Sequence, residues 1–342
     1  MLATFIHGVR DIRSGTLPRP ESVAGTVRIR VGGIGVCGSD LHYFKDGGIG
    51  SAVIDRPFVP GHEFAGWVDE DQPEHGLSKG QLVAVDPALP CGHCEWCRRG
   101  HVNLCPNVEF IGAPPHNGAM TELIAVRPSQ VFVMPDGFSV DQAVMLEPLG
   151  VAIHAMDHAK PQLLETIAVL GCGPIGLGIL QLARLAGAGR VYAIDPVDYR
   201  RDLALKLGAD DAAPDFKAVS QWTNGRGADL VIEATNAPEG LEHAVHAVRI
   251  GGRLLIAGIP DGDQYGLTAS LVRRKGLNIK FSRRMGHVYP RAIQLVSERR
   301  VDLDSMVTHH FPLSTAATAF EFQANFQDGA VKSVIVPDPE TG

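Results

Sequence analysis

The sequence lacks any long apolar run. No uninterrupted apolar stretch approaches the roughly 20 residues that a membrane-spanning helix needs, so an integral membrane protein is not expected. Low-complexity tracts and internal repeats are also missing. The N-terminal residues MLATFIHGVRDIRSG contain no charged leader followed by an apolar block, so we read no signal peptide there.

An excess of basic charge is missing too. The chain has 31 Lys and Arg residues against 38 Asp and Glu residues, which gives a formal net charge of −7. This balance favours solubility and gives no sign of a nucleic-acid or membrane partner. At 342 residues, with 45% hydrophobic residues, the chain is long enough for two globular domains.

Cysteine is scarce, but the six cysteines are not scattered. Four of them form a compact cluster: Cys91, Cys94, Cys97 and Cys105. Short loops of this kind let thiolates converge on one zinc ion, and four thiolates complete its tetrahedral coordination. The predicted role is therefore structural, a metal cross-link in a lobe with little core of its own. Because metal-binding thiols must stay reduced, the sequence also predicts a cytoplasmic protein.

A second, more dispersed set of metal-binding residues combines different ligand types. Cys37 in CGSD offers a thiolate and His62 in GHE an imidazole, while Glu63 or Glu147 offers a carboxylate. A mixed set with fewer protein ligands leaves one coordination position open for chemistry. We therefore expect a catalytic zinc site here.

The pattern of strands and helices changes near residue 150. Residues 1–150 read as β-rich and irregular, with short alternating runs such as TVRIRV (26–31) and QLVAV (81–85). From about 167, the apolar runs IAVLG, VYAID, DLVIEAT and RLLIAG alternate with helical patterns, and LNIKFS (277–282) follows as a last strand. This alternation predicts a doubly wound parallel sheet over 151–285. Residues 286–342, with HHFPLS and VKSVIVP as candidate strands, are expected to return to the first domain.

A glycine-rich turn joins the first strand of that sheet to the following helix. The segment GCGPIG places Gly171, Gly173 and Gly176 around Pro174 and Ile175. The first glycine makes the turn, the second lets a diphosphate approach the backbone, and the third allows close packing of helix and strand. The free N–H groups at the helix N-terminus favour an anion. We expect a dinucleotide to bind here.

Asp195 ends the next strand, 24 residues after Gly171. An acid at this place accepts hydrogen bonds from the adenosine ribose and repels a 2′-phosphate, which favours NAD over NADP. Arg200, a candidate cofactor contact, and Arg201 could neutralise such a phosphate, but Asp198 opposes that interpretation. An open zinc site with a nicotinamide cofactor predicts hydride transfer between an alcohol carbon and NAD.

The segment CGSDLHYFKDGGIGSAVIDRPFVPGHEFAGWV resembles the zinc-dependent medium-chain alcohol dehydrogenases, and most closely their sorbitol (polyol) and L-idonate branch. EPLGVAIHA (147–155), GCGPIG, and RRMGHVYP (283–290) preceding VTHHFPL are similar to that branch as well. The resemblance extends over essentially the whole chain. It implies a GroES-like catalytic domain, with a Rossmann domain inserted before the C-terminal return.

By position, the resemblance implies roles for individual residues. Cys37, His62 and Glu63 match the catalytic zinc ligands, and Glu147 approaches the metal directly or through water. Ser39 matches the hydroxyl that bonds the reacting oxygen, and His42 matches the outer end of a proton relay. Tyr43, Phe110 and Arg284 fall where the branch contacts its substrate. A dimer or tetramer, assembled through an edge of the nucleotide-binding sheet, is also implied.

The implied substrate is a small polyol or sugar acid with adjacent hydroxyls. Ala113 stands where the animal sorbitol enzymes have threonine, and the complete cysteine cluster differs from the animal enzymes and fits microbial relatives better. A threonine 3-dehydrogenase or a simple alcohol dehydrogenase would use the same parts. A non-catalytic nicotinamide-binding protein is a further alternative, although such relatives often lose the zinc ligands that this chain retains.

Overall fold

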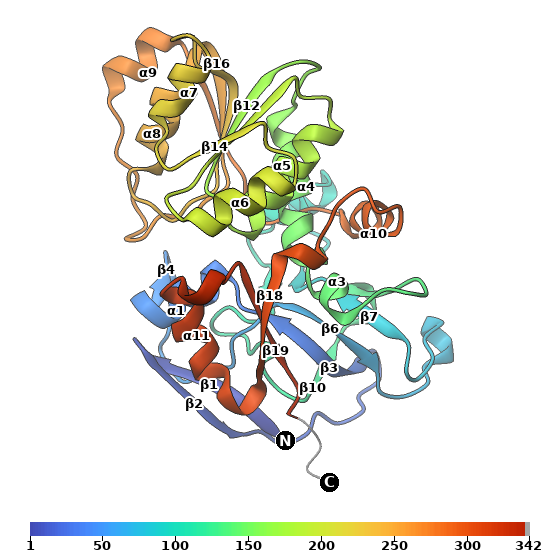
Figure 1. Ribbon diagram of the computed structural model, residues 1–342. Coiled ribbons are helices and arrows are strands. Elements are labelled where there is room, and N and C mark those ends of the chain that lie inside the picture. The colour runs from blue at the N-terminus through green and yellow to red at the C-terminus, as the bar shows by residue number, and fades with distance from the viewer. Residues whose placement is uncertain (339–342) are drawn as a thin grey trace. The chain divides into compact units, whose positions relative to one another are not determined.

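The computed structural model describes residues 1–338, and the chain divides into two compact units (Figure 1). Unit 1 comprises Met1–Glu147, Tyr289–Arg299 and the chain from Leu303 onward. Unit 2 comprises Pro148–Val288 and the short segment Arg300–Asp302. The chain therefore builds most of unit 1, then unit 2, and returns to unit 1. The sequence placed the two boundaries at 150 and 285.

Unit 1 is organised around a seven-stranded sheet whose centre is β3 (Val27–Gly35). β3 pairs antiparallel with three other strands, which are β10 (Leu123–Val126), β6 (Glu63–Val68) and β19 (Lys332–Val336). β7 (Leu82–Val85) and β11 (Val131–Val133) extend the sheet beyond β6, and β18 (Val307–Pro312) lies parallel to β19. The returning C-terminal segment thus completes the first sheet.

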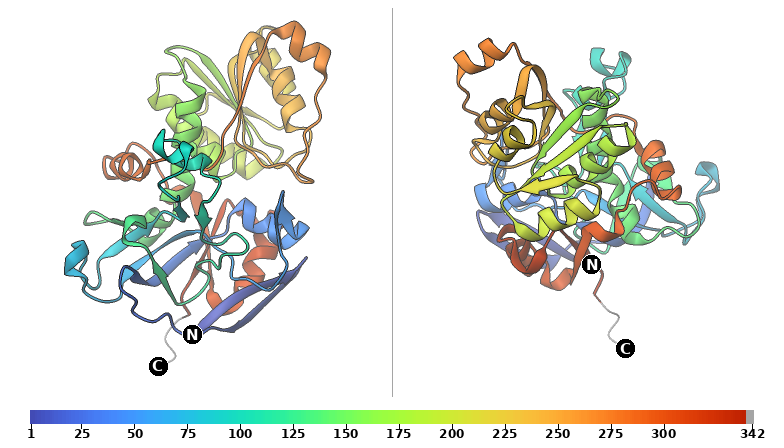
Figure 2. Two further views of the ribbon diagram at one scale, coloured as in Figure 1. Left: turned by 180° about the vertical axis from the view of Figure 1, so that it is seen from behind. Right: turned by 45° about the horizontal axis from the view of Figure 1, so that its top comes forward.

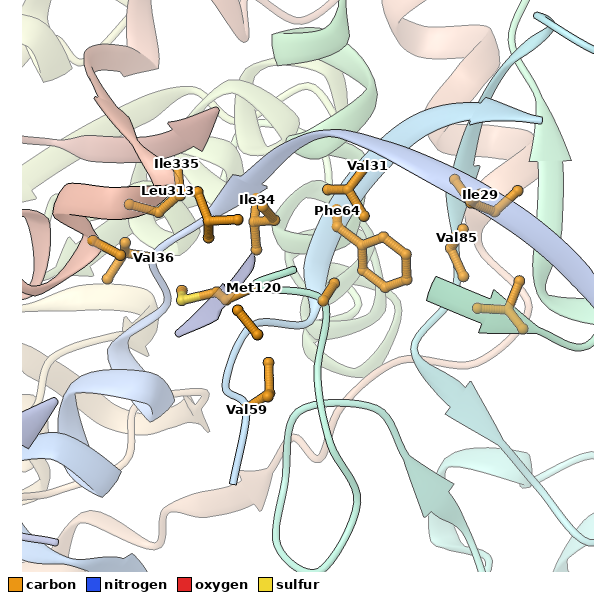
Figure 3. Packing of buried hydrophobic residues seen from close by; sticks show 14 of the residues in the cluster. Ile29, Val31, Ile34, Val36, Val59, Phe64, Val85, Met120, Leu313 and Ile335 are labelled. Atoms are coloured by element: carbon orange, nitrogen blue, oxygen red, sulfur yellow. The ribbon is translucent and has the colours of Figure 1, made fainter. Parts of the chain in front are cut away.

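The core of unit 1 forms where apolar side chains of this sheet meet (Figure 3). Ile29, Val31 and Ile34 of β3 are at most 1% exposed, and they share one cluster with Phe64 of β6 and Ile335 of β19. Full burial of such a side chain stabilises the fold by about 1.5–3 kcal/mol. Because β3 contributes to the sheet and to the core together, it fixes where the residues at its end lie.

Shorter elements surround this sheet. The helices of unit 1 are α1 (Gly38–Asp46), α2 (Glu95–Arg98), α3 (Val140–Val144), α10 (Tyr289–Ser297) and α11 (Ala316–Ala324). Three two-stranded ribbons pair β1 (Leu2–Gly8) with β2 (Asp11–Thr16), β4 (Gly48–Ile49) with β5 (Ala52–Val53), and β8 (Ala88–Leu89) with β9 (Glu109–Phe110). α1 ends at Gly47, whose φ of 79° provides the left-handed cap that glycine adopts most easily.

Unit 2 contains a six-stranded sheet in which every pair is parallel. Its order is β14-β13-β12-β15-β16-β17, with β12 at Thr166–Leu170, β13 at Arg190–Ile194, β14 at Asp211–Ala213, β15 at Ala228–Glu233, β16 at Val248–Ile256 and β17 at Asn278–Phe281. The chain runs outward from β12 in one direction and then returns to run outward from β15 in the other. This reversal creates a switch point between β12 and β15, where open sheets of this kind bind ligands. The predicted doubly wound sheet is confirmed, and only the three-residue strand β14 was not foreseen.

Helices cover both faces of this sheet. In Figures 1 and 2, α5 and α6 lie on one face and α7, α8 and α9 on the other. The helices of unit 2 are α4 (Leu146–Ala159, which begins in unit 1), α5 (Pro174–Leu185), α6 (Asp198–Lys206), α7 (Lys217–Trp222), α8 (Gly240–Ala247) and α9 (Ala269–Lys275). With both faces covered, β15 is buried along its whole length, as the uninterrupted apolar runs predict.

Among the helices of residues 1–338, none is long and apolar enough to cross a membrane.

Candidate functional site

The glycine-rich turn follows β12 directly. Gly171 has a φ of 91°, and a Cβ built on it would lie 2.6 Å from the carbonyl oxygen of Ala234. A Cβ on Gly176 would lie 1.8 Å from the carbonyl oxygen of Gly171. Gly173 differs, because the nearest atom to its added Cβ would be Arg200 Nη1, 3.9 Å away. The first and third glycines therefore serve the fold, while the second leaves open space beside the backbone.

That open space lies at the start of α5. Gly173 is the residue before the helix, and it offers no side chain to bond the N–H groups of the first turn. Pro174 then begins the helix, a position where its missing N–H costs nothing. The first turn of a helix, here one of 12 residues, leaves N–H groups without a partner in the helix, and these suit a diphosphate.

Asp195 connects the glycine-rich turn to the end of β13. Its Oδ2 accepts a hydrogen bond from the backbone N–H of Cys172 at 2.7 Å, and its Oδ1 accepts one from Val197 N–H at 2.9 Å. The side chain is buried, with Arg200 Nη1 4.0 Å from Oδ2. Arg201 forms an ion pair with Asp198 and donates to the carbonyl oxygen of Asp195 at 2.7 Å. Both arginines therefore already contact acidic residues of this segment.

The mixed ligand set is assembled by strand pairing. β3 and β6 are antiparallel, with Gly35 directly opposite Glu63. Cys37 follows two residues after Gly35 and precedes α1, while His62 immediately precedes β6. The ligand atoms of Cys37, His62 and Glu63 all lie within 4.8 Å of one another. A Cβ at Gly35 would come within 2.2 Å of Glu63 Oε2, so the position opposite the carboxylate has room only for glycine.

These three donors suit zinc, because one thiol, one imidazole and one carboxylate can converge and leave a fourth position open. Ser39 Oγ lies 3.4 Å from His62 Nε2, next to this set.

Asp40 contacts two residues of this ligand set, Cys37 and His62, a role that the sequence did not reveal. It is fully buried, and its Oδ2 accepts a hydrogen bond from Cys37 N–H at 3.0 Å. Its Oδ1 lies 3.5 Å from His62 Nδ1, so the two side chains interact electrostatically without a hydrogen bond. Burial lowers the pKa of His62, but the charges of Asp40 and Cys37 outweigh it and raise that pKa well above its usual value. A zinc ion binding this imidazole must therefore displace a proton.

Lys332 is a second residue that sequence reasoning missed. It opens β19 and is only 2% exposed, and its Nζ donates to Glu63 Oε2 and to the carbonyl oxygen of Val36 at 3.0 Å. A buried ammonium needs such partners, because an unpaired charge in the interior is strongly destabilising. The lysine holds one oxygen of the Glu63 carboxylate on the side of β19. A single lysine at the start of the apolar run KSVIV gave no signal of this role.

Glu147 lies close to this cluster without joining it. Within the described part of the chain, the group of mutually close ligand atoms contains Cys37, His62 and Glu63 but not Glu147. Burial raises the pKa of Glu147 to about 8, with the charge of His62 opposing the rise and that of Glu63 adding to it. A carboxyl group with this pKa exchanges protons near neutral pH.

The four-cysteine cluster forms as a compact group. The Sγ atoms of Cys91, Cys94, Cys97 and Cys105 lie within 4.8 Å of one another, and those of Cys94 and Cys105 are 3.9 Å apart. Tetrahedral zinc with bonds of about 2.3 Å separates its sulfur ligands by about 3.8 Å. Backbone N–H groups of His93 and Cys94 lower the pKa of Cys91 to about 6, while desolvation and neighbouring thiols raise that of Cys97. Four thiolates this close require a cation, so the cluster fits zinc.

The remaining predicted residues lie in three places. On α1, His42 Nδ1 lies 3.1 Å from Asp46 Oδ2, and Tyr43 is buried with its ring edge-on to Phe58 at 5.5 Å. The ring of Phe110 lies 5.4 Å from that of His62, which places it beside the mixed ligand set. Arg284 belongs to unit 2, in the segment after β17, with a φ of 54°.

A nucleotide-type glycine turn in a doubly wound sheet, together with one mixed and one four-cysteine metal cluster, defines a zinc- and dinucleotide-binding class of oxidoreductase. Comparison with known families agrees with this definition. Residues 23–136 match the alcohol dehydrogenase GroES-like domain, and residues 174–298 match the zinc-binding dehydrogenase domain. The chain belongs to the zinc-binding alcohol dehydrogenase family. The predicted family and fold class are thereby confirmed.

Individual relatives share the whole length of the chain. Sorbitol dehydrogenase of Bacillus subtilis is 35% identical, with 99% of this chain and 98% of the relative covered. The crystal structure of L-idonate 5-dehydrogenase from Escherichia coli K-12 is similar with a TM-score of 0.88 at 26% identity, covering 98% and 97% of the two chains. A zinc-binding dehydrogenase from Sinorhizobium meliloti 1021 bound to NADP gives a TM-score of 0.88 at 28% identity, with 98% and 99% covered.

The Lys332–Glu63 pair leads to a prediction about stability. Lys332→Met leaves the buried Glu63 carboxylate without its cation, so we expect the zinc-free protein to lose about 3 kcal/mol of unfolding free energy. The zinc-loaded protein should lose less, because the metal balances the same charge. Urea denaturation of both forms measures the difference. Lys280→Met, at an exposed lysine of β17, is the control, and equal losses in both variants would contradict the assignment.

Proposed function

We propose that this protein is a zinc-dependent, NAD-linked dehydrogenase that interconverts a secondary alcohol of a small polyol or sugar acid and its carbonyl form. The observation that carries the proposal is the convergence of Cys37, His62 and Glu63 into one ligand set with an open position. The sorbitol and L-idonate relatives support the substrate class. The proposal includes a catalytic zinc ion bound by these three residues, which Glu147 approaches directly or through water. It also includes a structural zinc ion bound by the four cysteines.

The residues around the ligand set supply the proton chemistry. Zinc, when bound by Cys37, His62 and Glu63, supplies Lewis acidity toward an alcohol oxygen. The Ser39 hydroxyl, 3.4 Å from His62 Nε2, is placed to accept the proton of the substrate hydroxyl. His42 is the outer proton acceptor, and the Asp46 carboxylate beside its Nδ1 favours the tautomer with the proton on that nitrogen. Tyr43, Phe110 and Arg284 are proposed substrate contacts.

The cofactor proposal rests on the segment around Asp195. The diphosphate is assigned to the Gly171–Gly176 turn, with Pro174 and Ile175 at the helix start, and the adenosine ribose to Asp195. Arg200 borders the open side of Gly173 and is placed to contact the cofactor there. Although one solved neighbour is bound to NADP, the buried carboxylate here disfavours a 2′-phosphate. NAD, when bound, is the hydride acceptor.

We further propose a cytoplasmic homo-oligomer, either a dimer or a tetramer. All six cysteines are free in the structure, as metal-binding thiols in a reducing compartment would be. Strand β17 ends the sheet of unit 2, and its Phe281 is 62% exposed. An open strand edge with an exposed aromatic side chain suits pairing with the same edge of a second copy. Light scattering on the purified protein measures the mass of the assembly.

The function is tested by NAD reduction with the zinc-loaded protein on a panel of polyols, sugar acids, threonine and simple alcohols. Selective turnover of a polyol or sugar acid is the expected result. Turnover of threonine or ethanol alone would assign the protein to another branch of the family. A silent panel with intact NADH binding would indicate a non-catalytic binding protein.

Removal of one proposed zinc ligand should separate chemistry from cofactor binding. Cys37→Ala takes the thiolate from the mixed set, so we expect turnover to be abolished and the zinc content to fall from two ions to one per chain. Its affinity for NADH should remain within about threefold, because the glycine turn belongs to unit 2. Metal analysis and NADH fluorescence titration measure the two effects. Turnover that survives the loss of zinc would reject the mechanism.

Removal of the Asp195 carboxylate should change cofactor preference. Asp195→Ala deletes a charged acceptor, whose hydrogen bonds contribute about 1.5–3 kcal/mol, and should weaken NAD binding roughly tenfold or more. NADP binding should weaken less, so the preference for NAD narrows. The control is Asp198→Asn, which alters a neighbouring carboxylate that is 88% exposed. An unchanged ratio of NAD to NADP affinity in Asp195→Ala would refute the ribose assignment.

A further inference from the structure

A buried carboxylate stands at the switch point of unit 2 without a role in the chemistry proposed above. Glu233 is the last residue of β15 and is fully buried. The register of the sheet aligns it with Leu170 at the end of β12 and with Ile256 at the end of β16. Glu233 therefore lies at the carboxyl edge of the sheet, where this fold binds its ligands.

The side chain of Glu233 connects two loops at this edge. Its Oε1 accepts hydrogen bonds from the backbone N–H of Thr235 at 2.7 Å and from the Thr235 hydroxyl. Its Oε2 accepts one from the hydroxyl of Tyr265 at 3.1 Å, and that hydroxyl also lies 3.2 Å from the carbonyl oxygen of Gly258. The loop after β15 and the loop after β16 are thus bonded to one carboxylate.

Two glycines bring the backbone close to this carboxylate. A Cβ on Gly240 would lie 2.6 Å from Glu233 Oε1, and a Cβ on Gly258 would lie 2.6 Å from Oε2. The backbone joins the same arrangement, since Gly258 N–H donates to the carbonyl oxygen of Glu233 at 3.1 Å. Glycines at these positions let the backbones approach Glu233 closely, so the positions of both loops depend on it.

One of these loops touches the glycine-rich turn. The Cβ that Gly171 lacks would lie 2.6 Å from the carbonyl oxygen of Ala234 and 2.9 Å from Cγ2 of Thr235. Ala234 N–H also donates to the carbonyl oxygen of Leu170 at 2.8 Å. The Glu233 carboxylate therefore positions Thr235, and Thr235 packs against the first residue of the turn.

Each half of the sheet is expected to bind one mononucleotide of the cofactor. Strands β12 to β14 carry the glycine turn and Asp195, which is the adenosine half. In a doubly wound sheet, the second half, here β15 to β17, takes the other mononucleotide. The loops that Glu233 holds follow β15 and β16, so they border the nicotinamide half.

We infer that Glu233 is a positioning residue for the nicotinamide half of the cofactor, acting through the Thr235 and Gly258 loops. The inference rests on the proposed function, since it presupposes that unit 2 binds NAD. Glu233 is suited to this task because the three groups that contact its side chain, Thr235 N–H and the hydroxyls of Thr235 and Tyr265, can all donate hydrogen bonds to it. Glutamine at the same place would keep an oxygen for Thr235 but turn its N–H₂ group toward Tyr265, so both the negative charge and the bond that the Tyr265 hydroxyl donates to Oε2 would be lost.

The experiment compares the whole cofactor with its adenosine half. Isothermal titration measures NADH and AMP binding to the wild-type full chain and to Glu233→Gln. We expect the Kd for NADH to rise about tenfold, as expected for loss of a charged hydrogen-bond acceptor, while the Kd for AMP changes less than about twofold because Asp195 is untouched.

A matched control lies at the opposite end of the same strand. Asp229 of β15 is also a buried carboxylate, bonded to Arg226, to Arg249 and to Thr166 N–H. Asp229→Asn should lower stability without changing the ratio of NADH to AMP affinity. Tyr265→Phe removes only the hydroxyl that donates to Glu233, and should raise the Kd for NADH severalfold even where Glu233→Gln fails to fold.

Each result decides between the inference and its alternatives. Unchanged NADH binding in Tyr265→Phe and Glu233→Gln would overturn the inference, as would an equal loss of AMP and NADH affinity. An NADH loss as large in Asp229→Asn as in Glu233→Gln would also overturn it. If the wild-type protein bound neither AMP nor NADH, the proposed function itself would be rejected. That outcome is distinct from a failure of the variants alone.

Discussion

The balance of buried charge beside β6 is the constraint on which unit 1 depends. The thiol of Cys37, the imidazole of His62 and the carboxylate of Glu63 lie close together, and the fold supplies Lys332 as a permanent counterion for Glu63. Lys332 balances the Glu63 carboxylate and Asp40 lies beside the His62 imidazole, and buried charge without such a partner is strongly destabilising. A zinc ion held by Cys37, His62 and Glu63 would replace protons in this group, so metal binding would be coupled to the stability of unit 1.

Glycine sets the distances in both units, for the same steric reason. Gly35 gives the Glu63 carboxylate its space, and Gly171, Gly240 and Gly258 let three backbone segments meet around Glu233 and Thr235. A methyl group at these positions would come within 2.9 Å of a neighbouring atom, closer than real Cβ contacts allow. The metal ligands and the nucleotide turn are thus positioned by close backbone contact, which side-chain flexibility cannot replace.

Rigid strands carry the site, and turns at their ends present the reactive groups. Cys37 follows β3, Glu63 opens β6 and Glu233 closes β15, so each functional side chain is placed by hydrogen-bonded strand pairing. Loops alone would hold such groups with less precision, since they have fewer buried contacts. Asp195 has a structural and a binding role. Its carboxylate accepts a hydrogen bond from the glycine turn and lies where the ribose is expected.

The sequence by itself predicted the four-cysteine cluster, the glycine turn and the parallel sheet, because each has a local signature. Cysteine spacing, GCGPIG and alternating apolar runs are recorded in consecutive residues. Only the tertiary structure decided that Lys332 pairs with Glu63, 269 residues away in the chain, and that Tyr265 donates to Glu233, 32 residues away. Such partners are brought together by strand pairing and burial, and a buried lysine or glutamate has the same letter in the sequence as an exposed one.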